Sequence, residues 1–542
     1  MNQNQLLTSR QIIMLHIGFS IVYISGLFIP LMENDSAQHA SMAMRMTLNN
    51  DFLHIFKGEN PYLDKPHMHF WLAALSMKMF GISHVAYRIP ALLCLALGAF
   101  STKKLAEILY DNEHTGYLAS LIFLSAQTII LSAHDVRTDA VLTGFIIFSI
   151  WQFVRFIKTQ HISSAILAGL GTALAFSSKG LMAIVIIGFC ILAYLLYSRD
   201  WKKFFNLKII IVALSFAIGI IPVLYAYHVQ FGDEGIRFIL FNQSVNRLTA
   251  SGFEETSPDY FFFFHTLLWA FLPFSLAFYF GIFEKTAFFI KTRFRKTEGN
   301  EFLTLGGFWL VMLVFSASKF KLPHYLNGLI AVLSVLTAAY LLEMFRKNSL
   351  KKIRILYGIQ LFVIFAVLIG IILLTLYFTG IPNIIMYLVA AAVYGCLIIV
   401  IFSKKDLFRK YVFASLIFAI AVNLYLNTQF YPVLTQYQGS LKLAQFVNKN
   451  HIEKDRIFML KGYEPWAFDF YTQRNTPRVE AGALKKGDYL VVYDEHLNEV
   501  GRKYSVVDQE NHYRITRLSL KFLNPKTREQ QYEKMSLIQI TE

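Results

Sequence analysis

The chain has 542 residues, of which 55% are hydrophobic and only 16% are charged, and its formal net charge is +16. A soluble globular chain is nearer one quarter charged, so this composition excludes an ordinary soluble protein and favours repeated membrane spans. The sequence has no nucleic-acid-binding module. Its three cysteines lie far apart in apolar runs, which excludes a disulfide framework and a thiolate metal site.

About thirteen apolar windows of membrane-spanning length follow one another up to residue 430. They lie near residues 12–31, 86–108, 115–132, 138–157, 163–178, 180–198, 207–228, 262–286, 301–318, 322–343, 351–378, 383–403 and 409–430. We interpret the first window as a retained span and not as a cleaved signal peptide, because no small-residue cleavage site follows it.

The loops between these windows differ in charge, and this difference predicts their orientation. Alternate loops carry the clusters of Lys and Arg, such as Lys103 with Lys104 and Lys404 with Lys405. Cytoplasmic loops are enriched in these residues, so we expect a cytoplasmic N-terminus and an outer-face C-terminus. The same enrichment explains the positive net charge of the chain. The alternative explanation is a surface that binds anionic lipids or nucleic acid.

From residue 431 onward the composition changes, because charges of both signs return and strand-like runs appear near residues 489–493 and 513–518. We predict a mostly α-helical transmembrane domain over residues 1–430 and a small soluble α/β domain over residues 431–542. The aromatic stretch at residues 462–474 is interpreted as the core of the second domain, with a substrate groove as the alternative.

The predicted topology places unusual polar residues on the outer face. A large first outer loop spans residues 32–85, and a long loop spans residues 229–261. Ionisable residues at membrane depth are costly and are usually functional. The candidates are Glu33, Asp35, Tyr62, Asp64, Lys65, His67, His69, Asp139, Lys179, Lys319, Lys321 and Tyr325.

These residue types suit the transfer of a glycosyl group from a lipid phosphate. One carboxylate, Asp35 or Glu33, would deprotonate the acceptor. Lysines 65, 179, 319 and 321 would hold the leaving phosphate, which needs no acid. If His67 and His69 lie on extended chain, they could bind a divalent metal together with Asp64, although such a reaction does not require one.

Four blocks in the same order resemble the GT-C glycosyltransferases, namely the enzymes that transfer 4-amino-4-deoxy-L-arabinose to lipid A and, more distantly, the protein O-mannosyltransferases. The blocks are a first outer loop with the segments PYLDKPHMHFW and FGISHVAYR, then RTDAVL, then SSKGLM, and then FSASKFKLPHY. The matched residues in the first block are Asp35, Ala40, Pro61, Tyr62, Asp64, Lys65, Pro66, Trp71, Phe80, Gly81 and Arg88.

The resemblance implies that Asp35 is the base and that Asp139 is a second acid that supports the site. It also implies that Tyr62 and Lys65 lie near the carrier phosphate, with Lys179 and Tyr325 as possible helpers. The sequence departs from the family pattern at Ser36, Gln38–His39 and His67–Met68, and it lacks the proline expected near Asn327. The donor sugar and the acceptor therefore stay open.

The leading hypothesis is an inverting glycosyltransferase of the bacterial inner membrane, with a periplasmic C-terminal domain. It would use a polyprenyl-phosphate sugar as co-substrate and act on lipid A, another glycolipid, a glycan or a protein. The alternative is a transporter or a flippase for lipid-linked sugars. Transporters place polar residues near the midplane of the bilayer, whereas here these residues gather at the outer ends of the spans.

Overall fold

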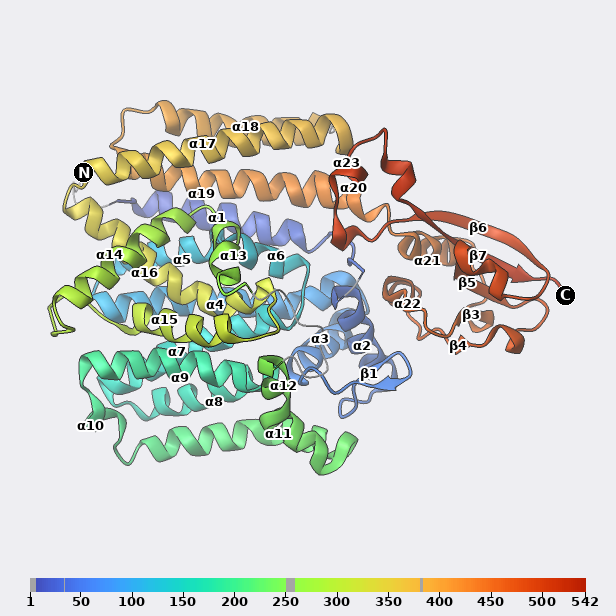
Figure 1. Cartoon of the computed structure of the whole chain (residues 1–542), viewed down its shortest axis with the longest axis horizontal. Helices are drawn as coiled ribbons and strands as arrows, with labels where there is room; N and C mark the ends of the chain where they lie inside the picture. The colour runs from blue at the N-terminus through green and yellow to red at the C-terminus, as the bar shows by residue number, and fades with distance from the viewer. Residues whose placement is uncertain (1–5, 34, 250–258, 381–383) are drawn as a thin grey trace.

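The computed structural model describes residues 6–33, 35–249, 259–380 and 384–542. The molecule is elongated, with a bundle of long helices and a small sheet domain that projects from one end of the bundle (Figure 1). We call the end of the bundle beside the sheet the domain end and the opposite end the far end. The short helix α10 (Trp201–Phe204) lies at the far end.

Each predicted apolar window coincides with one helix or with two consecutive helices. The helices of the bundle are α1 (Ser9–Gly26), α4 (His84–Tyr110), α5 (Glu113–Ser125), α6 (Gln127–His134), α7 (Thr138–Thr159), α8 (Ile162–Lys179), α9 (Leu181–Ser198), α11 (Ile209–Arg237), α13 (Phe262–Ala270), α14 (Ser275–Lys291), α15 (Leu303–Ala317), α16 (Asn327–Arg346), α17 (Leu350–Leu374), α18 (Ile384–Phe402) and α19 (Leu407–Tyr425). Among the described residues, eight helices are long and apolar enough to cross a membrane, or nine if the bent pair α5 and α6 is one span. The multi-span helical fold is therefore confirmed, and the count of thirteen stays a prediction.

Two predicted spans are interrupted, and one predicted loop is helical. Helices α5 and α6 meet at an angle of 57°, and window 262–286 forms α13 and α14, because Pro273 between them has no amide hydrogen to continue a helix. The prediction of a long loop at residues 229–261 was wrong for the first part of this stretch. There α11 continues to Arg237, and α12 (Gln243–Thr249) follows. Gly232, with φ of 62°, permits a sharp bend in α11. Residues 250–258 of that loop lie outside the described residues.

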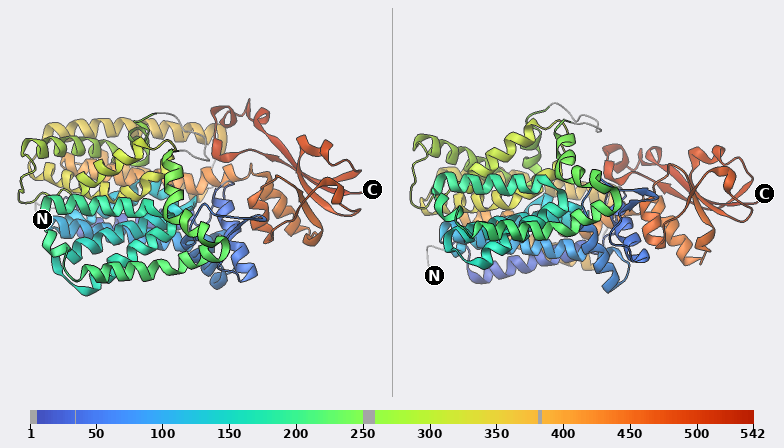
Figure 2. Two further views of the ribbon diagram at one scale, coloured as in Figure 1. Left: turned by 60° about the horizontal axis from the view of Figure 1, so that its bottom comes forward. Right: turned by 90° about the horizontal axis from the view of Figure 1, so that it is seen from below.

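The first predicted loop is a folded layer at the domain end. It contains α2 (Asp35–Asn49), the strands β1 (Phe56–Lys57) and β2 (Asn60–Pro61), and α3 (Met68–Phe80). Figure 2 shows this layer between the bundle and the sheet domain. It is fastened to α11, because Gln230 exchanges two hydrogen bonds with the backbone of Ile55, at 3.0 and 2.7 Å.

A fully buried arginine joins the helix ends that surround the site. Arg88, near the start of α4, donates hydrogen bonds to the carbonyl oxygens of Leu27 at 3.0 Å and His134 at 2.8 Å, and also to that of Ile29. The carbonyls of Leu27 and His134 belong to the ends of α1 and α6, where helices leave backbone acceptors unpaired, and that of Ile29 lies in the chain after α1. The guanidinium therefore fixes the chain just before Glu33 and just before the α6–α7 turn.

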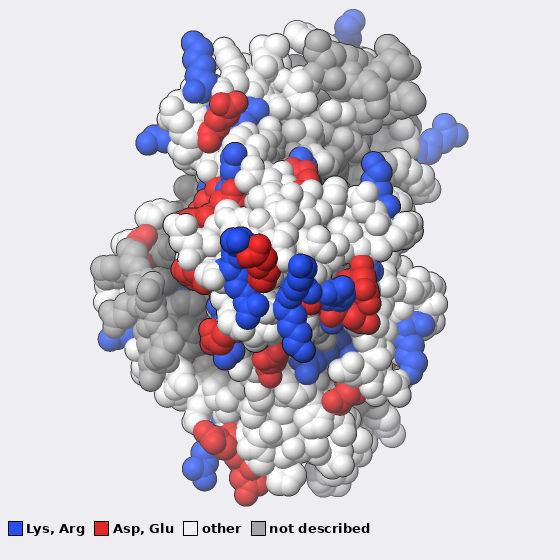
Figure 3. Space-filling model, turned by 90° about the vertical axis from the view of Figure 1, so that its right-hand side faces the viewer, with Lys and Arg blue, Asp and Glu red and all other residues white. Residues whose placement is uncertain are grey.

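The sheet domain contains five strands in the order β4–β3–β5–β7–β6. Their bounds are β3 (Ile457–Leu460), β4 (Arg478–Val479), β5 (Tyr489–Tyr493), β6 (Tyr504–His512) and β7 (Glu533–Ile540). Strand β3 pairs in parallel with β4 and β5, whereas β7 pairs antiparallel with β5 and β6. Helices α21 (Gly439–Lys449) and α22 (Trp466–Thr472) pack beside the sheet. Figure 3 views the molecule from the domain end, and there charged side chains of both signs gather over the sheet domain.

Two predictions for this domain have different outcomes. The strand predicted at residues 489–493 is confirmed as β5, but residues 513–518 form a 3-10 turn, Ile515–Arg517, and no strand. The apolar side chains of this run have another role, because Tyr513 and Ile515 are both buried against the end of the bundle. The core interpretation of the aromatic stretch is confirmed for Phe468, which is buried in the sheet domain's own hydrophobic cluster. Trp466 and Phe470 are also buried, but they belong to the large cluster of the bundle and the first loop.

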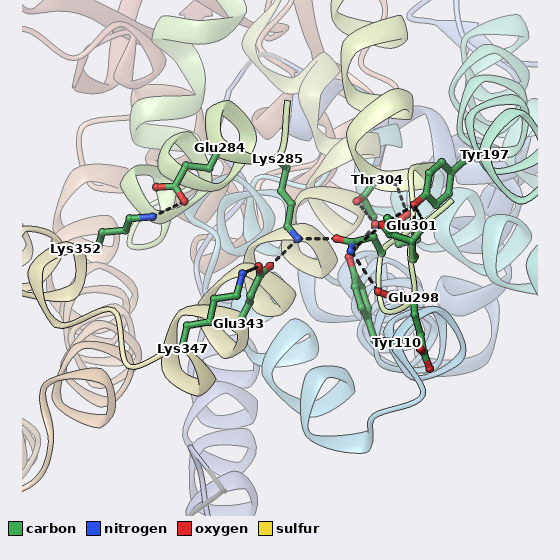
Figure 4. Close-up of polar contacts among 12 residues, drawn as sticks. Tyr110, Tyr197, Glu284, Lys285, Glu298, Glu301, Thr304, Glu343, Lys347 and Lys352 are labelled. Atoms are coloured by element: carbon green, nitrogen blue, oxygen red, sulfur yellow. Dashed lines mark hydrogen bonds and ion pairs between the residues drawn. The ribbon is translucent and has the colours of Figure 1, made fainter. Parts of the chain in front are cut away.

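The far end of the bundle has its own network of ion pairs (Figure 4). Glu343 on α16 pairs with Lys285 and with Lys347, both at 2.6 Å. Glu284 on α14 pairs with Lys352 on α17 at 2.7 Å. These contacts tie together helix ends whose loops carry the predicted cationic clusters, at the end opposite to the sheet domain.

Candidate functional site

A cavity of about 290 Å³ opens at the domain end of the bundle. Its lining comes from the start of α2, from α6, from the α6–α7 turn, from α13 and from the segment before α16. The polar and aromatic lining residues are Asp35, Thr128, Ser132, Asp135, Arg137, Asp139, Trp269, His324 and Asn327. The structure thus brings together the predicted acids Asp35 and Asp139, which belong to two different motifs.

Asp35 is the first residue of α2, where a carboxylate is favoured by the helix dipole. Its Oδ2 atom lies 3.0 Å from Nη1 of Arg137, and Nη2 of Arg137 lies 2.9 Å from Oδ2 of Asp135. These neighbours, Asp135 first and then Asp35, raise the pKa of Arg137, so its guanidinium stays charged. The side chain of Asp35 is still 49% exposed. The arginine therefore orients a carboxylate that remains open to a ligand.

Asp139 is buried beneath the same cavity, in the first turn of α7. Its Oδ1 atom lies 2.5 Å from Nζ of Lys179, the last residue of α8, and its Oδ2 atom lies 4.0 Å from Nε2 of His324. Lys179 Nζ also lies 4.9 Å from the centre of the Tyr325 ring. Three of the predicted residues, Asp139, Lys179 and Tyr325, therefore form one buried cluster, which joins α7, α8 and the start of α16.

Glu33 lies close to Asp35 in sequence but faces the sheet domain. Its carboxylate accepts hydrogen bonds from the Ser440 hydroxyl and from the backbone N–H of Ala467, the latter at 3.2 Å. Its own backbone N–H donates to Oε1 of Gln438 at 2.6 Å. Glu33 is absent from the lining of the cavity. Of these two acids, only Asp35 lines the cavity.

The buried position of Glu33 predicts a pH-dependent stability. Burial raises the pKa of this carboxyl from 4.5 to about 7. Since the folded state holds this proton up to a higher pH than the unfolded state, the stability that it contributes is lost as pH rises from about 5 to 7. The difference in pKa between the folded and unfolded states corresponds to ~3 kcal/mol of folding stability. We expect the unfolding temperature of the wild type to fall between pH 5.5 and pH 8, and the Glu33→Gln variant to show a clearly smaller fall. Equal slopes in the two proteins would contradict this interpretation.

The remaining predicted phosphate-binding residues lie around the cavity and not in its lining. Lys65 pairs with Asp64 at 2.8 Å. The pKa of the buried His39 imidazole is lowered mainly by burial, and then by the nearby His69 and by the charge of Lys65. Lys321 is buried, with its Nζ 5.5 Å from the centre of the Tyr260 ring.

Two further candidates lie in the same surroundings. Tyr62 follows β2, and its backbone N–H donates to the carbonyl of Ile55 at 2.8 Å. Lys319 is exposed in the segment between α15 and α16. The structure places both at the domain end, outside the lining residues of the cavity.

The predicted metal site at Asp64, His67 and His69 is not formed. His67 Nε2 lies 3.0 Å from the Leu53 carbonyl oxygen, and His69 Nε2 lies 3.1 Å from the Tyr87 hydroxyl. The prediction assumed extended chain, but α3 begins at Met68, and on a helix residues i and i+2 do not face each other. Burial lowers the pKa of both imidazoles to about 4. Within the described ranges, the structure has no group of three or more His, Cys, Asp or Glu residues that could hold a metal ion.

Three further residues, Arg137, Asp135 and His324, line the cavity although they were not among the predicted site residues. A signal was present for Arg137, because it stands two residues before Asp139 in the RTDAVL block. Its pairing with Asp35 depends on the contact between α2 and the α6–α7 turn, which no local pattern specifies.

Comparisons with known proteins agree with this architecture. Residues 64–226 match the family described as dolichyl-phosphate-mannose-protein mannosyltransferase. The structure of ArnT from Cupriavidus metallidurans bound to undecaprenyl phosphate superposes with a TM-score of 0.73 and 16% identity, covering 98% of both chains. The oligosaccharyltransferase of Archaeoglobus fulgidus gives a TM-score of 0.51 with 11% identity over 89% of this chain and 70% of that one.

The chain therefore shares the fold of ArnT. The predicted resemblance is also confirmed in sequence. The undecaprenyl phosphate-alpha-4-amino-4-deoxy-L-arabinose arabinosyl transferase 2 of Proteus mirabilis is 23% identical over 67% of this chain and 65% of its own length. The corresponding transferase of Edwardsiella ictaluri is 26% identical over 60% of this chain and 58% of its own length. The chain thus matches less than two thirds of the length of these relatives.

Proposed function

We propose that this chain is an inverting glycosyltransferase of the GT-C type, which moves a sugar from a polyprenyl phosphate to an acceptor at the domain end of the bundle. The observation that carries the proposal is the cavity with Asp35 at its edge, half-exposed and held by Arg137. The names of the relatives, which specify undecaprenyl phosphate, support the class of donor. The acceptor is lipid A, another glycolipid, a glycan or a protein.

In the proposed mechanism, Asp35 takes the proton from the acceptor hydroxyl or amine while that atom attacks the anomeric carbon of the sugar. The bond between this carbon and the phosphate oxygen breaks in the same displacement, which inverts the configuration. The departing phosphate needs no proton, but it needs cations. The cavity lining contains three carboxylates and one guanidinium, so we assign the phosphate to Lys65, Lys319 and Lys321, which lie outside the lining, and to Tyr62.

We further propose that the chain lies in a bacterial inner membrane with the far end of the bundle in the cytoplasm. The cationic loops belong to the far end, as expected for cytoplasmic loops. The sheet domain and the cavity then face the periplasm, where a lipid-linked sugar and an outer-leaflet acceptor can meet. The N-terminus is cytoplasmic in this orientation, and the C-terminal domain is periplasmic.

The test uses the full chain in proteoliposomes with a panel of radiolabelled polyprenyl-phosphate sugars and cell-envelope lipids, glycans and proteins as acceptors. We expect label to pass to an acceptor with the wild type, and the Arg137→Gln variant to lower kcat/KM at least tenfold, because Asp35 loses the group that orients it. The matched control is Arg502→Gln, an exposed arginine of the sheet domain, which should leave transfer unchanged. If no donor gives transfer and labelled lipid crosses the bilayer instead, the protein is a flippase.

A further inference from the structure

The chain from Arg514 to Arg528, within the sheet domain, has an unusual composition. It contains five basic residues and no acidic ones, namely Arg514, Arg517, Lys521, Lys526 and Arg528. Among the described residues, no carboxylate pairs with any of the five. Two leucines in the same segment are exposed, Leu518 at 42% and Leu520 at 85%. We call this stretch of residues 514–528 the basic segment.

The basic segment is fixed against the domain end of α17. Arg528 donates a hydrogen bond from Nη2 to the carbonyl of Tyr377 at 2.8 Å, and its guanidinium lies 4.9 Å from the centre of the Phe378 ring. Phe522, in the short helix α23 (Leu520–Leu523), stacks on Tyr513 with ring centres 3.7 Å apart. Figure 1 shows α23 beside the end of α17. The exposed leucines therefore belong to an ordered surface next to a membrane-spanning helix.

A groove of about 590 Å³ lies between α17 and the basic segment. One wall is apolar and contains Gly370, Leu373 and Leu374 of α17, while the other includes Leu520 and Lys526. Helix α17 is a candidate span, and its neighbouring side chains Ile369, Ile372 and Leu376 are 58%, 57% and 71% exposed. The apolar surface of a membrane-spanning helix lies in the hydrocarbon core of the bilayer, so we expect the groove to open toward the lipid chains.

We propose that this groove binds one anionic membrane phospholipid, with an acyl chain along α17 and the phosphate beside Lys526 and Lys521. Basic residues near a membrane surface attract anionic lipids, and exposed apolar side chains beside them insert into the interface. The groove shares no residue with the Asp35 cavity. The proposal therefore does not depend on the glycosyltransferase activity.

The test measures lipid binding to the purified full-length chain by native mass spectrometry, with phosphatidylglycerol as the anionic probe and phosphatidylcholine as the zwitterionic one. We expect the double variant Lys521→Gln/Lys526→Gln to bind phosphatidylglycerol at least tenfold more weakly and phosphatidylcholine as the wild type does. The matched control, Lys485→Gln/Lys486→Gln, removes the same charge from exposed lysines elsewhere in the sheet domain and should change neither affinity more than twofold.

A second variant tests the apolar wall while the charges stay in place. A Cβ atom added at Gly370 meets no atom within 4 Å, so Gly370→Leu places an apolar side chain in the groove and should weaken the binding of both lipids. A Cβ atom added at Gly358 on the same helix also meets nothing within 4 Å, so Gly358→Leu is the control. Equal binding of the two lipids by the wild type, or unchanged phosphatidylglycerol binding in both test variants, would overturn the proposal. A protein bound at the groove in place of lipid would do the same.

Discussion

Replacing Asp35 by asparagine is expected to lower the rate of sugar transfer by about 10²–10⁴-fold, the usual contribution of a general base. Asparagine keeps the size of the side chain and a carbonyl oxygen toward Arg137, but it cannot accept the acceptor's proton at neutral pH. The affinity for the donor should change little, because the phosphate is assigned to lysines outside the cavity lining. Initial rates in proteoliposomes at saturating donor, with kcat and KM determined separately, measure this effect.

The control for this variant is Asp455→Asn, a carboxylate of the sheet domain that is 88% exposed and paired with Arg474 at 3.5 Å. It should transfer sugar at the wild-type rate. The unfolding temperature of Asp35→Asn should stay close to that of the wild type, because the side chain is half-exposed. A folded Asp35→Asn protein with full activity would show that another carboxylate is the base, and Asp135 and Asp139 are then the remaining acids in the cavity lining.

Replacing Lys179 by methionine is expected to destabilise the folded protein by about 3–5 kcal/mol, because it leaves the Asp139 carboxylate buried without its cation. The side chains of this pair are only 2% and 4% exposed. The double variant Asp139→Leu/Lys179→Met removes both charges and should lose less stability than Lys179→Met alone. Unfolding in mixed micelles, followed by circular dichroism for the two single variants and the double variant, gives the coupling free energy.

The far end of the bundle supplies the comparison for this pair (Figure 4). Lys347 pairs with Glu343 at 2.6 Å, but its side chain is 69% exposed. Solvent screens such a pair, so Lys347→Met should change the free energy of unfolding by less than about 1 kcal/mol. If the two lysine variants cost the same, burial does not govern the strength of the Asp139–Lys179 pair.

The sequence by itself determined where the helices run and at which end of the bundle the unusual charges gather. Membrane spans depend on about 20 consecutive apolar residues, so windows such as 138–157 and 351–378 can be recognised without knowledge of the rest of the chain. The position of Asp35 after the first window, and of Asp139 at the start of a later one, placed both acids at the same end of the bundle before any contact was known.

Only the tertiary structure decided which of these residues meet. Asp35 and Glu33 are two positions apart, yet one faces the cavity beside Arg137 and the other is buried against Ser440 of the sheet domain. His67 and His69 separate because the chain there begins a helix instead of an extended segment. For the two acids, the deciding contacts come from segments that are distant in sequence. For the two histidines, the deciding factor is a helical conformation that packing imposes. The local order of residues specifies neither of these.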